Sequence, residues 1–203
     1  MRIIGGTAGG RQLKVPKGLG VRPTPDLVRQ AIFNSLGSRV IDARVLELFG
    51  GTGALGLECL SRGAASAVCI EKSAKHAAFI RENARLAGLD GAAFQVRVMD
   101  AFEAVRQFAA TGTRFDLVMA DPPYGDKNVG RRSVSFAQLV LDDPYLPGLI
   151  APHGRLVLGH ARRDAVEVPV RWHERKVLKH GDSLFRMLEV IAPAPDGAEP
   201  AVS

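Results

Sequence analysis

The sequence predicts an α/β fold whose sheet is parallel for most of its width. From residue 44 to about residue 158, short apolar runs alternate with helical stretches. This alternation is typical of parallel strands joined by crossover helices. Two later strand-like runs, 172–179 and 184–191, are joined by only four residues. Because so short a link permits only a hairpin, we expect an antiparallel pair at one edge of the sheet.

Composition bounds the class of protein. The chain has 203 residues, of which 46% are hydrophobic and 24% charged, and these proportions exclude collagen, a coiled coil and wholesale disorder. Cys59 and Cys69 lie in apolar runs, where we expect reduced core thiols, as in a cytoplasmic protein. No apolar run reaches the roughly 18 residues that span a bilayer. The first residues lack the apolar stretch of a secretory signal, so we expect a cytoplasmic location without membrane contact.

Charge is concentrated near the N-terminus. The formal net charge is +6, and residues 1–39 hold seven basic side chains but one acidic side chain. Clustered cations favour a polyanionic partner such as nucleic acid, although a solubilising tail would give the same charge. The candidate phosphate contacts are Arg11, Lys14, Lys17 and Arg22.

The chain divides into three expected segments. We expect a small basic arm or hairpin at 1–20, a main domain at 21–192 and a disordered, proline-rich tail at 193–203. The main domain begins with a helix at about 24–36, since Thr24-Pro25 resembles a helix start and Gly37 a helix end.

Within the main domain, apolar runs and glycines place the remaining elements. Parallel strands are expected at 45–49, 67–70, 93–98, 115–120 and 156–158. Helices are expected at 55–60, 73–87, 101–110 and about 135–149.

A glycine-rich loop follows the first strand. Residues 51–56 read GTGALG, which matches G-x-G-x-x-G, and Glu71 follows Gly51 by 20 residues. This pattern is the fingerprint of dinucleotide binding, but the same geometry suits any adenosine-containing cofactor. S-adenosylmethionine carries an ammonium and a sulfonium group in place of a pyrophosphate, and Glu47, Glu71 and Asp100 would favour such a cation. The loop alone is therefore consistent with three interpretations: a site for S-adenosylmethionine, a site for a nicotinamide dinucleotide, or a tight turn without a ligand.

A tetrapeptide after the fourth strand indicates the chemistry. Asp121-Pro122-Pro123-Tyr124 stands where ligands bind in open parallel sheets. Its prolines stiffen the turn and leave carbonyl oxygens without N–H donors. The Asp121 carboxylate and the Pro122 carbonyl can each accept one N–H of a nucleobase amine, while Tyr124 stacks on the ring. This arrangement predicts amine methylation without a metal or a covalent nucleophile, whereas an ordinary rigid turn is the alternative.

With these residues in view, the chain resembles the RsmD family, bacterial class I methyltransferases that modify guanine N2 of 16S rRNA. The resemblance covers about residues 1–191. It is carried by MRIIGG at 1–6, GR at 10–11, RPT at 22–24, GALGLE at 53–58, LSRGA at 60–64, EK at 71–72, DPPY at 121–124 and GD at 181–182.

The resemblance implies a Rossmann-like sheet of seven strands, S-adenosylmethionine as donor with S-adenosylhomocysteine as product, and no metal. It also implies 16S rRNA as partner, within an assembled or assembling 30S particle, and a monomer is expected. The expected catalytic residues are Asp121, Pro122, Pro123 and Tyr124. The expected cofactor-binding residues are Glu47, Phe49, Gly50, Gly51, Thr52, Gly53, Glu71, Lys72, Asp100 and Ala101.

Two departures from the family pattern affect the cofactor loop. Glu47 stands where the family usually has aspartate, and Gly50 stands where it usually has alanine, so we expect altered cofactor affinity with activity retained. The same tetrapeptide would also serve N6 of adenine or N4 of cytosine, in RNA or DNA. A non-catalytic RNA-binding module and a protein glutamine methyltransferase are further alternatives.

Overall fold

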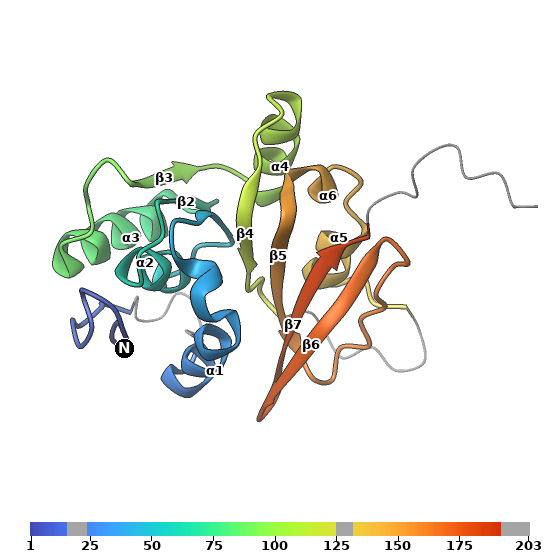
Figure 1. Ribbon diagram of the computed structural model, residues 1–203, viewed down its shortest axis with the longest axis horizontal. Helices are drawn as coiled ribbons and strands as arrows, with labels where there is room; N and C mark the ends of the chain where they lie inside the picture. Colours follow the sequence, from blue (N-terminus) through green and yellow to red (C-terminus); the bar gives the residue numbers. More distant parts are fainter. Residues whose placement is uncertain (16–23, 125–131, 192–203) are drawn as a thin grey trace, which may run out of the picture.

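The computed structural model describes residues 1–15, 24–124 and 132–191. Its sheet has seven strands in the order β3-β2-β1-β4-β5-β7-β6 (Figure 1). The strands are β1 (Arg44–Leu48), β2 (Ser66–Glu71), β3 (Phe94–Val98), β4 (Phe115–Ala120), β5 (Ile150–Ala161), β6 (Trp172–His180) and β7 (Ser183–Val190). The first five strands pair in parallel, and β7 runs antiparallel to both β5 and β6. The predicted fold class and the predicted edge hairpin are confirmed.

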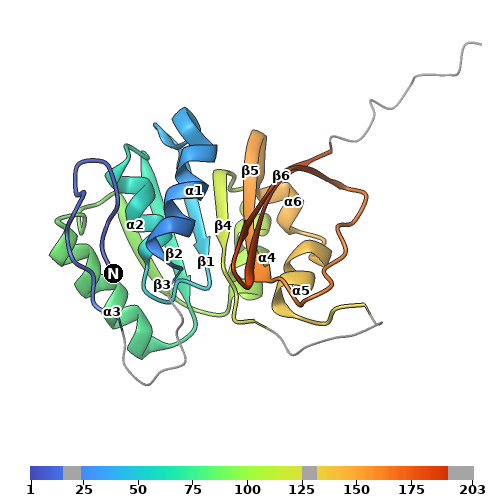
Figure 2. The ribbon, with the colours of Figure 1, turned by 90° about the horizontal axis from the view of Figure 1, so that it is seen from below.

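Helices cover both faces of this sheet. They are α1 (Asp26–Leu36), the short 3₁₀ helix η1 (Gly37–Val40), α2 (Ala54–Ser61), α3 (Ala74–Ala87), α4 (Ala101–Ala110), α5 (Phe136–Asp142) and α6 (Leu146–Leu149). Figures 1 and 2 show α1, α2 and α3 grouped on one side and α4, α5 and α6 on the other. No helix in the described ranges combines the length and the apolar character needed to cross a bilayer.

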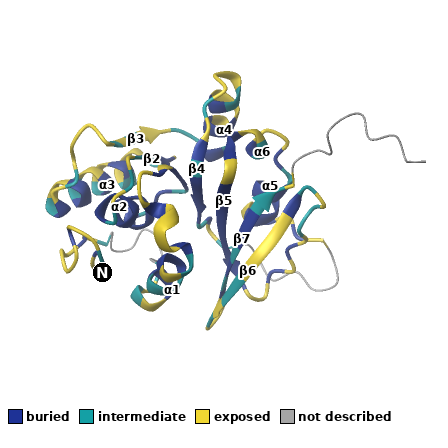
Figure 3. Cartoon of the chain, viewed as in Figure 1, coloured by how far each residue is buried: buried dark blue, intermediate teal, exposed yellow. Residues whose placement is uncertain are grey.

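Alternate residues of the central strands pack into separate hydrophobic cores on the two faces of the sheet. Val45 and Leu117 pack with α1 and α2, whereas Leu46, Leu48 and Val118 pack with α4, α5 and α6. Figure 3 shows β4 and β5 mostly buried and β6 largely exposed. Strands buried on both faces are almost continuously apolar, which explains why β4 and β5 could be predicted from the sequence.

The expected helix at 135–149 is wrong in one respect, because two short helices replace it. Pro144 lacks an N–H and disfavours helical geometry at Asp143 before it. The Asp143 carboxylate instead accepts hydrogen bonds from the amides of Tyr145 and Leu146, at 2.8 and 3.0 Å, and starts a second helix. The hairpin link is also tighter than expected, with only residues 181–182 between β6 and β7.

The N-terminal ribbon, residues 1–13, folds back on itself as the expected hairpin. Arg2 pairs with Gln12 in an antiparallel bridge. Ile3, Ala8 and Leu13 are buried against α2 and α3. The amides of Ile4 and Gly5, which follow Ile3, donate to the buried Glu58 carboxylate of α2 at 2.8 and 2.9 Å. The ribbon is therefore docked on the domain, while the expected tail at 193–203 lies outside the described residues.

We predict that Glu58→Ala destabilises the fold by about 3 kcal/mol, because it leaves two amides and the Arg62 guanidinium without their buried acceptor. Urea unfolding of the wild type and the variant measures this loss. Glu82→Ala is the matched control, since Glu82 makes solvent-accessible ion pairs with Lys14 and Arg85, which contribute little to stability. Equal unfolding midpoints for wild type and Glu58→Ala would contradict the prediction.

Candidate active site

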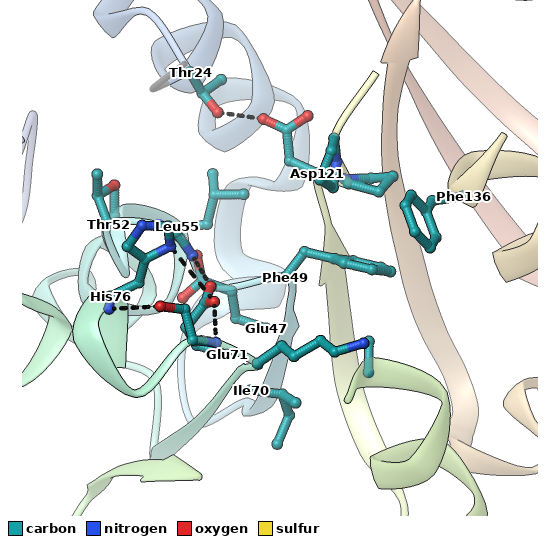
Figure 4. Close-up of a pocket in the computed structure, with 18 of the residues that line it drawn as sticks. Thr24, Glu47, Phe49, Thr52, Leu55, Ile70, Glu71, His76, Asp121 and Phe136 are labelled. Carbon is teal, nitrogen blue, oxygen red and sulfur yellow. Dashed lines mark hydrogen bonds and ion pairs between the residues drawn. The ribbon is translucent and has the colours of Figure 1, made fainter. Parts of the chain in front are cut away.

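A cavity of about 660 Å³ opens at the carboxyl ends of the parallel strands (Figure 4). Strands β1 and β2 and the turn that follows β4 contribute residues to its wall, and Ser183 and Phe185 of β7 close one side. The predicted site residues on this wall are Glu47, Phe49, Gly50, Gly51, Thr52, Glu71, Lys72, Asp100, Ala101, Asp121, Pro122, Pro123 and Tyr124. Gly53 is not among the lining residues. It precedes α2 with φ +73°, and a Cβ there would lie 2.6 Å from Ile80 Cγ2, so its role is in packing.

Glu47 occupies the N-terminus of α2. Its carboxylate accepts hydrogen bonds from the amides of Leu55 and Gly56, at 3.2 and 3.0 Å. The helix dipole favours a negative charge there, and a dinucleotide's pyrophosphate would need the same donors. Gly56 permits the approach, since a Cβ at Gly56 would lie 2.8 Å from Glu47 Oε2. The structure thus disfavours the dinucleotide reading of the glycine motif.

Glu71 fastens the glycine-rich loop to the end of β2. Its Oε2 accepts a hydrogen bond from the Gly51 amide at 2.9 Å, and its Oε1 accepts one from the Ser73 amide at 2.8 Å. His76 Nδ1 lies 3.6 Å from Oε1 (Figure 4). Each carboxylate oxygen has two acceptor positions, so Glu71 can also accept a hydrogen bond from a ligand hydroxyl.

Asp100 starts α4 at the end of β3. Its Oδ1 accepts hydrogen bonds from the Phe102 and Glu103 amides at 2.9 and 3.4 Å. Its Oδ2 lies 3.4 Å from the ammonium of Lys72, which is largely exposed. Glu47, Glu71 and Asp100, which were predicted to lie near one crevice, therefore line the same pocket. Each of them also accepts hydrogen bonds from nearby backbone amides.

Aromatic rings form an apolar wall that sequence reasoning found only in part. The Phe49 ring centroid lies 6.0 Å from that of Phe102 and 5.8 Å from that of Phe136. Phe49 has φ +59°, a conformation that is costly for an aromatic residue and often marks a functional site. Phe136 lines the pocket from α5. Phe136 could not be predicted as a pocket residue, because its helix lies far along the chain from the glycine-rich loop.

Asp121 has an incompletely satisfied carboxylate. Its Oδ2 accepts a hydrogen bond from the Thr24 hydroxyl at 2.6 Å. Its Oδ1 is buried and has no hydrogen-bond partner among the described residues. Burial raises the pKa of Asp121 to about 6, against the opposing hydrogen bond from Thr24. A buried acceptor without a donor is costly, and it suits a site whose donor arrives with the ligand.

Tyr124 is anchored from the hairpin. Its hydroxyl donates a hydrogen bond to the Ser183 Oγ at 2.6 Å. The sequence analysis did not predict this contact, because Ser183 belongs to β7, 59 residues away. The anchor limits rotation of the ring beside the Asp121 carboxylate.

The two nucleic-acid candidates that the structure describes, Arg11 and Lys14, lie apart from the pocket wall. Arg11 is exposed on the N-terminal ribbon, and Lys14 Nζ lies 3.1 Å from the Glu82 carboxylate. Lys17 and Arg22 lie outside the described residues. In the described part of the chain, no group of three histidine, cysteine or acidic side chains could hold a metal ion.

The family model described as "Conserved hypothetical protein 95" matches residues 1–189. The chain belongs to this family. A relative from Escherichia coli K12, "Ribosomal RNA small subunit methyltransferase D", is 44% identical over 124 residues, which are 61% of this chain. The match spans only 60% of that protein's own length. The resemblance to RsmD is confirmed.

Two further proteins extend the likeness to most of the chain. "Putative rRNA methyltransferase YlbH" of Bacillus subtilis is 35% identical over 169 residues, covering 83% of this chain and 86% of that protein. The solved structure titled "Putative methyltransferase yhhF from Escherichia coli" has 32% identity and a TM-score of 0.74. It covers 95% of this chain and 99% of its own.

We predict that Glu47 makes the fold less stable as pH rises. Burial raises the pKa of Glu47 to about 7, although the Cys69 thiol and the two α2 amides oppose the shift. Because the folded-state pKa exceeds the unfolded value, the stabilising contribution is complete below about pH 4.5 and disappears as pH rises through about 7.

Urea unfolding of wild type and Glu47→Gln between pH 5 and 8 tests this prediction, since other titrating groups cancel in the difference. Relative to the variant, the wild type should lose roughly 3 kcal/mol across this range. Parallel stability curves for the two proteins would show that Glu47 does not titrate there.

Proposed function

We propose that this protein transfers a methyl group from S-adenosylmethionine to the exocyclic N2 of a guanine in 16S rRNA. The buried Asp121 Oδ1, an acceptor without a partner in the described structure, beside the rigid Pro122-Pro123 turn, carries the proposal. The names of the E. coli and B. subtilis relatives support rRNA as the substrate class.

The residues present fit this cofactor. Glu71 would accept hydrogen bonds from ribose hydroxyls, and Asp100 with Ala101 would meet the adenine edge. Phe49 adds an apolar surface. The α2 amides are already paired with Glu47, which leaves an acidic pocket suited to a cation. When bound, S-adenosylmethionine supplies an electrophilic methyl group on a sulfonium.

The chain's own residues hold and orient the amine. Asp121 and the Pro122 carbonyl each accept one N–H, which turns the nitrogen lone pair out of conjugation with the base. The Tyr124 ring stacks on the extruded base, and its bond to Ser183 fixes the ring. The Asp121 carboxylate also stabilises the positive charge that develops on nitrogen.

We further propose that the protein acts as a monomer in the cytoplasm on an assembled or assembling 30S particle. The exposed edge strand β6 carries charged residues at Glu174, Arg175 and Lys176. Charged side chains on an edge strand oppose pairing with a second sheet, which supports the monomer.

The test is incubation with tritiated S-adenosylmethionine and either 30S particles or naked 16S rRNA, followed by nucleoside analysis. N2-methylguanosine is the expected product. N6-methyladenosine or N4-methylcytidine would replace the proposal with the alternative amine substrates, because the same turn serves those amines. Absence of labelled nucleoside in both substrates would reject rRNA methylation.

We predict that Asp121→Ala lowers turnover at least about 100-fold, because the amine loses an acceptor and its charge stabilisation. Binding of S-adenosylmethionine, measured by calorimetry, should change less than threefold. Asp116→Ala is the matched control on the same strand, since Asp116 pairs with Arg44 outside the pocket. Near wild-type turnover in Asp121→Ala would contradict the mechanism.

We predict that Arg11→Ala and Lys14→Ala weaken RNA binding and reduce its salt dependence. Each lost phosphate contact should lower the slope of log K against log salt by about one. Point substitutions are preferable to removing the ribbon, because Ile3 and Leu13 belong to the core. Exposed Arg114, at the opposite end of β4, is the control position. Unchanged slopes in both variants would exclude the ribbon from the RNA interface.

A further inference from the structure

We propose that Thr24 is a positioning residue that fixes the orientation of the Asp121 carboxylate, and that buried Arg29 holds Thr24 in place. The inference rests on the proposed function, because the substrate amine is what the oriented carboxylate would bind. It concerns Thr24, which lines the pocket from the segment before α1, and Arg29 of α1 itself, rather than residues of the sheet.

The Thr24 hydroxyl hydrogen-bonds to the pocket carboxylate of Asp121 and does not cap the helix that follows it. Threonine before a helix commonly caps it by accepting a backbone N–H, but α1 has Pro25 at its N-cap and no side-chain cap. Thr24 Oγ1 instead donates to Asp121 Oδ2 at 2.6 Å, across 97 residues of sequence (Figure 4). The N-terminus of α1 therefore has no side-chain cap. The Thr24 hydroxyl binds the Asp121 carboxylate in the pocket instead.

Arg29 fixes the backbone of Thr24. Its fully buried guanidinium donates to the Thr24 carbonyl at 3.1 Å and to the Asp26 carboxylate at 2.9 Å. It also donates to the carbonyl of Arg2 in the N-terminal ribbon. Burying an arginine is costly unless its donors are well used. Here one side chain joins the ribbon, the start of α1 and the Asp121 partner.

The other carboxylate oxygen is confined by β5 and β7. A Cβ at Gly159 would lie 2.4 Å from Asp121 Oδ1 and 2.7 Å from Phe185 Cε1. Carboxylates rotate readily about their terminal torsion. The Thr24 bond on Oδ2 therefore selects one orientation, and leaves the buried Oδ1 as the oxygen without a hydrogen-bond partner in the described structure.

Few charges influence this carboxylate. The charge of Asp121 helps to raise the pKa of Glu47 on β1, whereas Gly159 on β5 and Phe185 on β7 bring no charge near Asp121. The Thr24 hydrogen bond favours the ionised form of Asp121. Loss of the hydroxyl should therefore raise the pKa of Asp121 further.

Thr24→Val and Thr24→Ser separate positioning from packing. Thr24→Val should reduce kcat about 10-fold to 100-fold, change the Kd for S-adenosylmethionine less than threefold, and move the acid limb of kcat/KM to higher pH. Thr24→Ser keeps the hydroxyl and should behave like the wild type. Carbon-13 NMR of Asp121 in the unliganded protein should show a higher titration midpoint in Thr24→Val only.

Wild-type kcat and a wild-type Asp121 titration in Thr24→Val would overturn the proposal. A loss of cofactor affinity equal to the loss of kcat would also overturn it, because Thr24 would then be a cofactor ligand. If the wild type methylates no RNA, the proposed function fails and the catalytic role fails with it. The NMR titration then decides alone whether Thr24 holds Asp121.

Arg29→Lys tests whether Arg29 holds Thr24 in place. Lysine keeps the charge but cannot hold the Thr24 and Arg2 carbonyls in the same fork geometry. The Asp121 midpoint should rise in this variant too, and its effect on kcat should not add to that of Thr24→Val. Additive effects, or an unchanged midpoint, would remove Arg29 from the positioning role.

Discussion

Negative charge gathered at one edge of a parallel sheet is the constraint on which this structure depends. Buried carboxylates must find donors or lose their charge. Glu47 uses the first amides of α2, Glu71 uses the loop amide of Gly51, and Asp100 uses the first turn of α4. Asp121 alone among these four has an oxygen without a partner in the described structure. That asymmetry supports the proposed role of Asp121 as the acid that binds the substrate amine, whereas the other three acids hold the backbone of the pocket.

The sequence predicts the fold well because the sheet is covered on both faces. Runs such as 115–120, which is apolar at every position except Asp116, are followed or preceded by glycines and prolines, so their positions can be predicted from neighbouring residues. The break at Pro144 was also local, but the apolar residues on either side of it concealed it. The DPPY turn could be recognised because its stiffness and its acceptors are properties of four adjacent residues.

The partners of that turn could not be predicted in the same way. Thr24 reaches Asp121 across 97 residues, and Ser183 reaches Tyr124 across 59. Neither contact follows from periodicity or composition. The charge pattern suggested an RNA-binding arm, yet the same ribbon is held to α2 by Glu58 and to the start of α1 by Arg29. Any RNA contact by its basic side chains would therefore be made by a segment that is docked on α1 and α2.

The two departures in the cofactor loop have a shared physical reason. Gly50 is held by the backbone, since its amide donates to the Ile70 carbonyl at 2.8 Å and its carbonyl accepts from the Gly53 amide at 2.7 Å. A Cβ at Gly50 would lie 2.4 Å from Cys69 Sγ, and the Cys69 thiol also hydrogen-bonds to Glu47. The longer acid, the thiol and the glycine therefore fit one another. A larger residue at position 50 would clash with the Cys69 thiol and so disturb the surroundings of the Glu47 carboxylate.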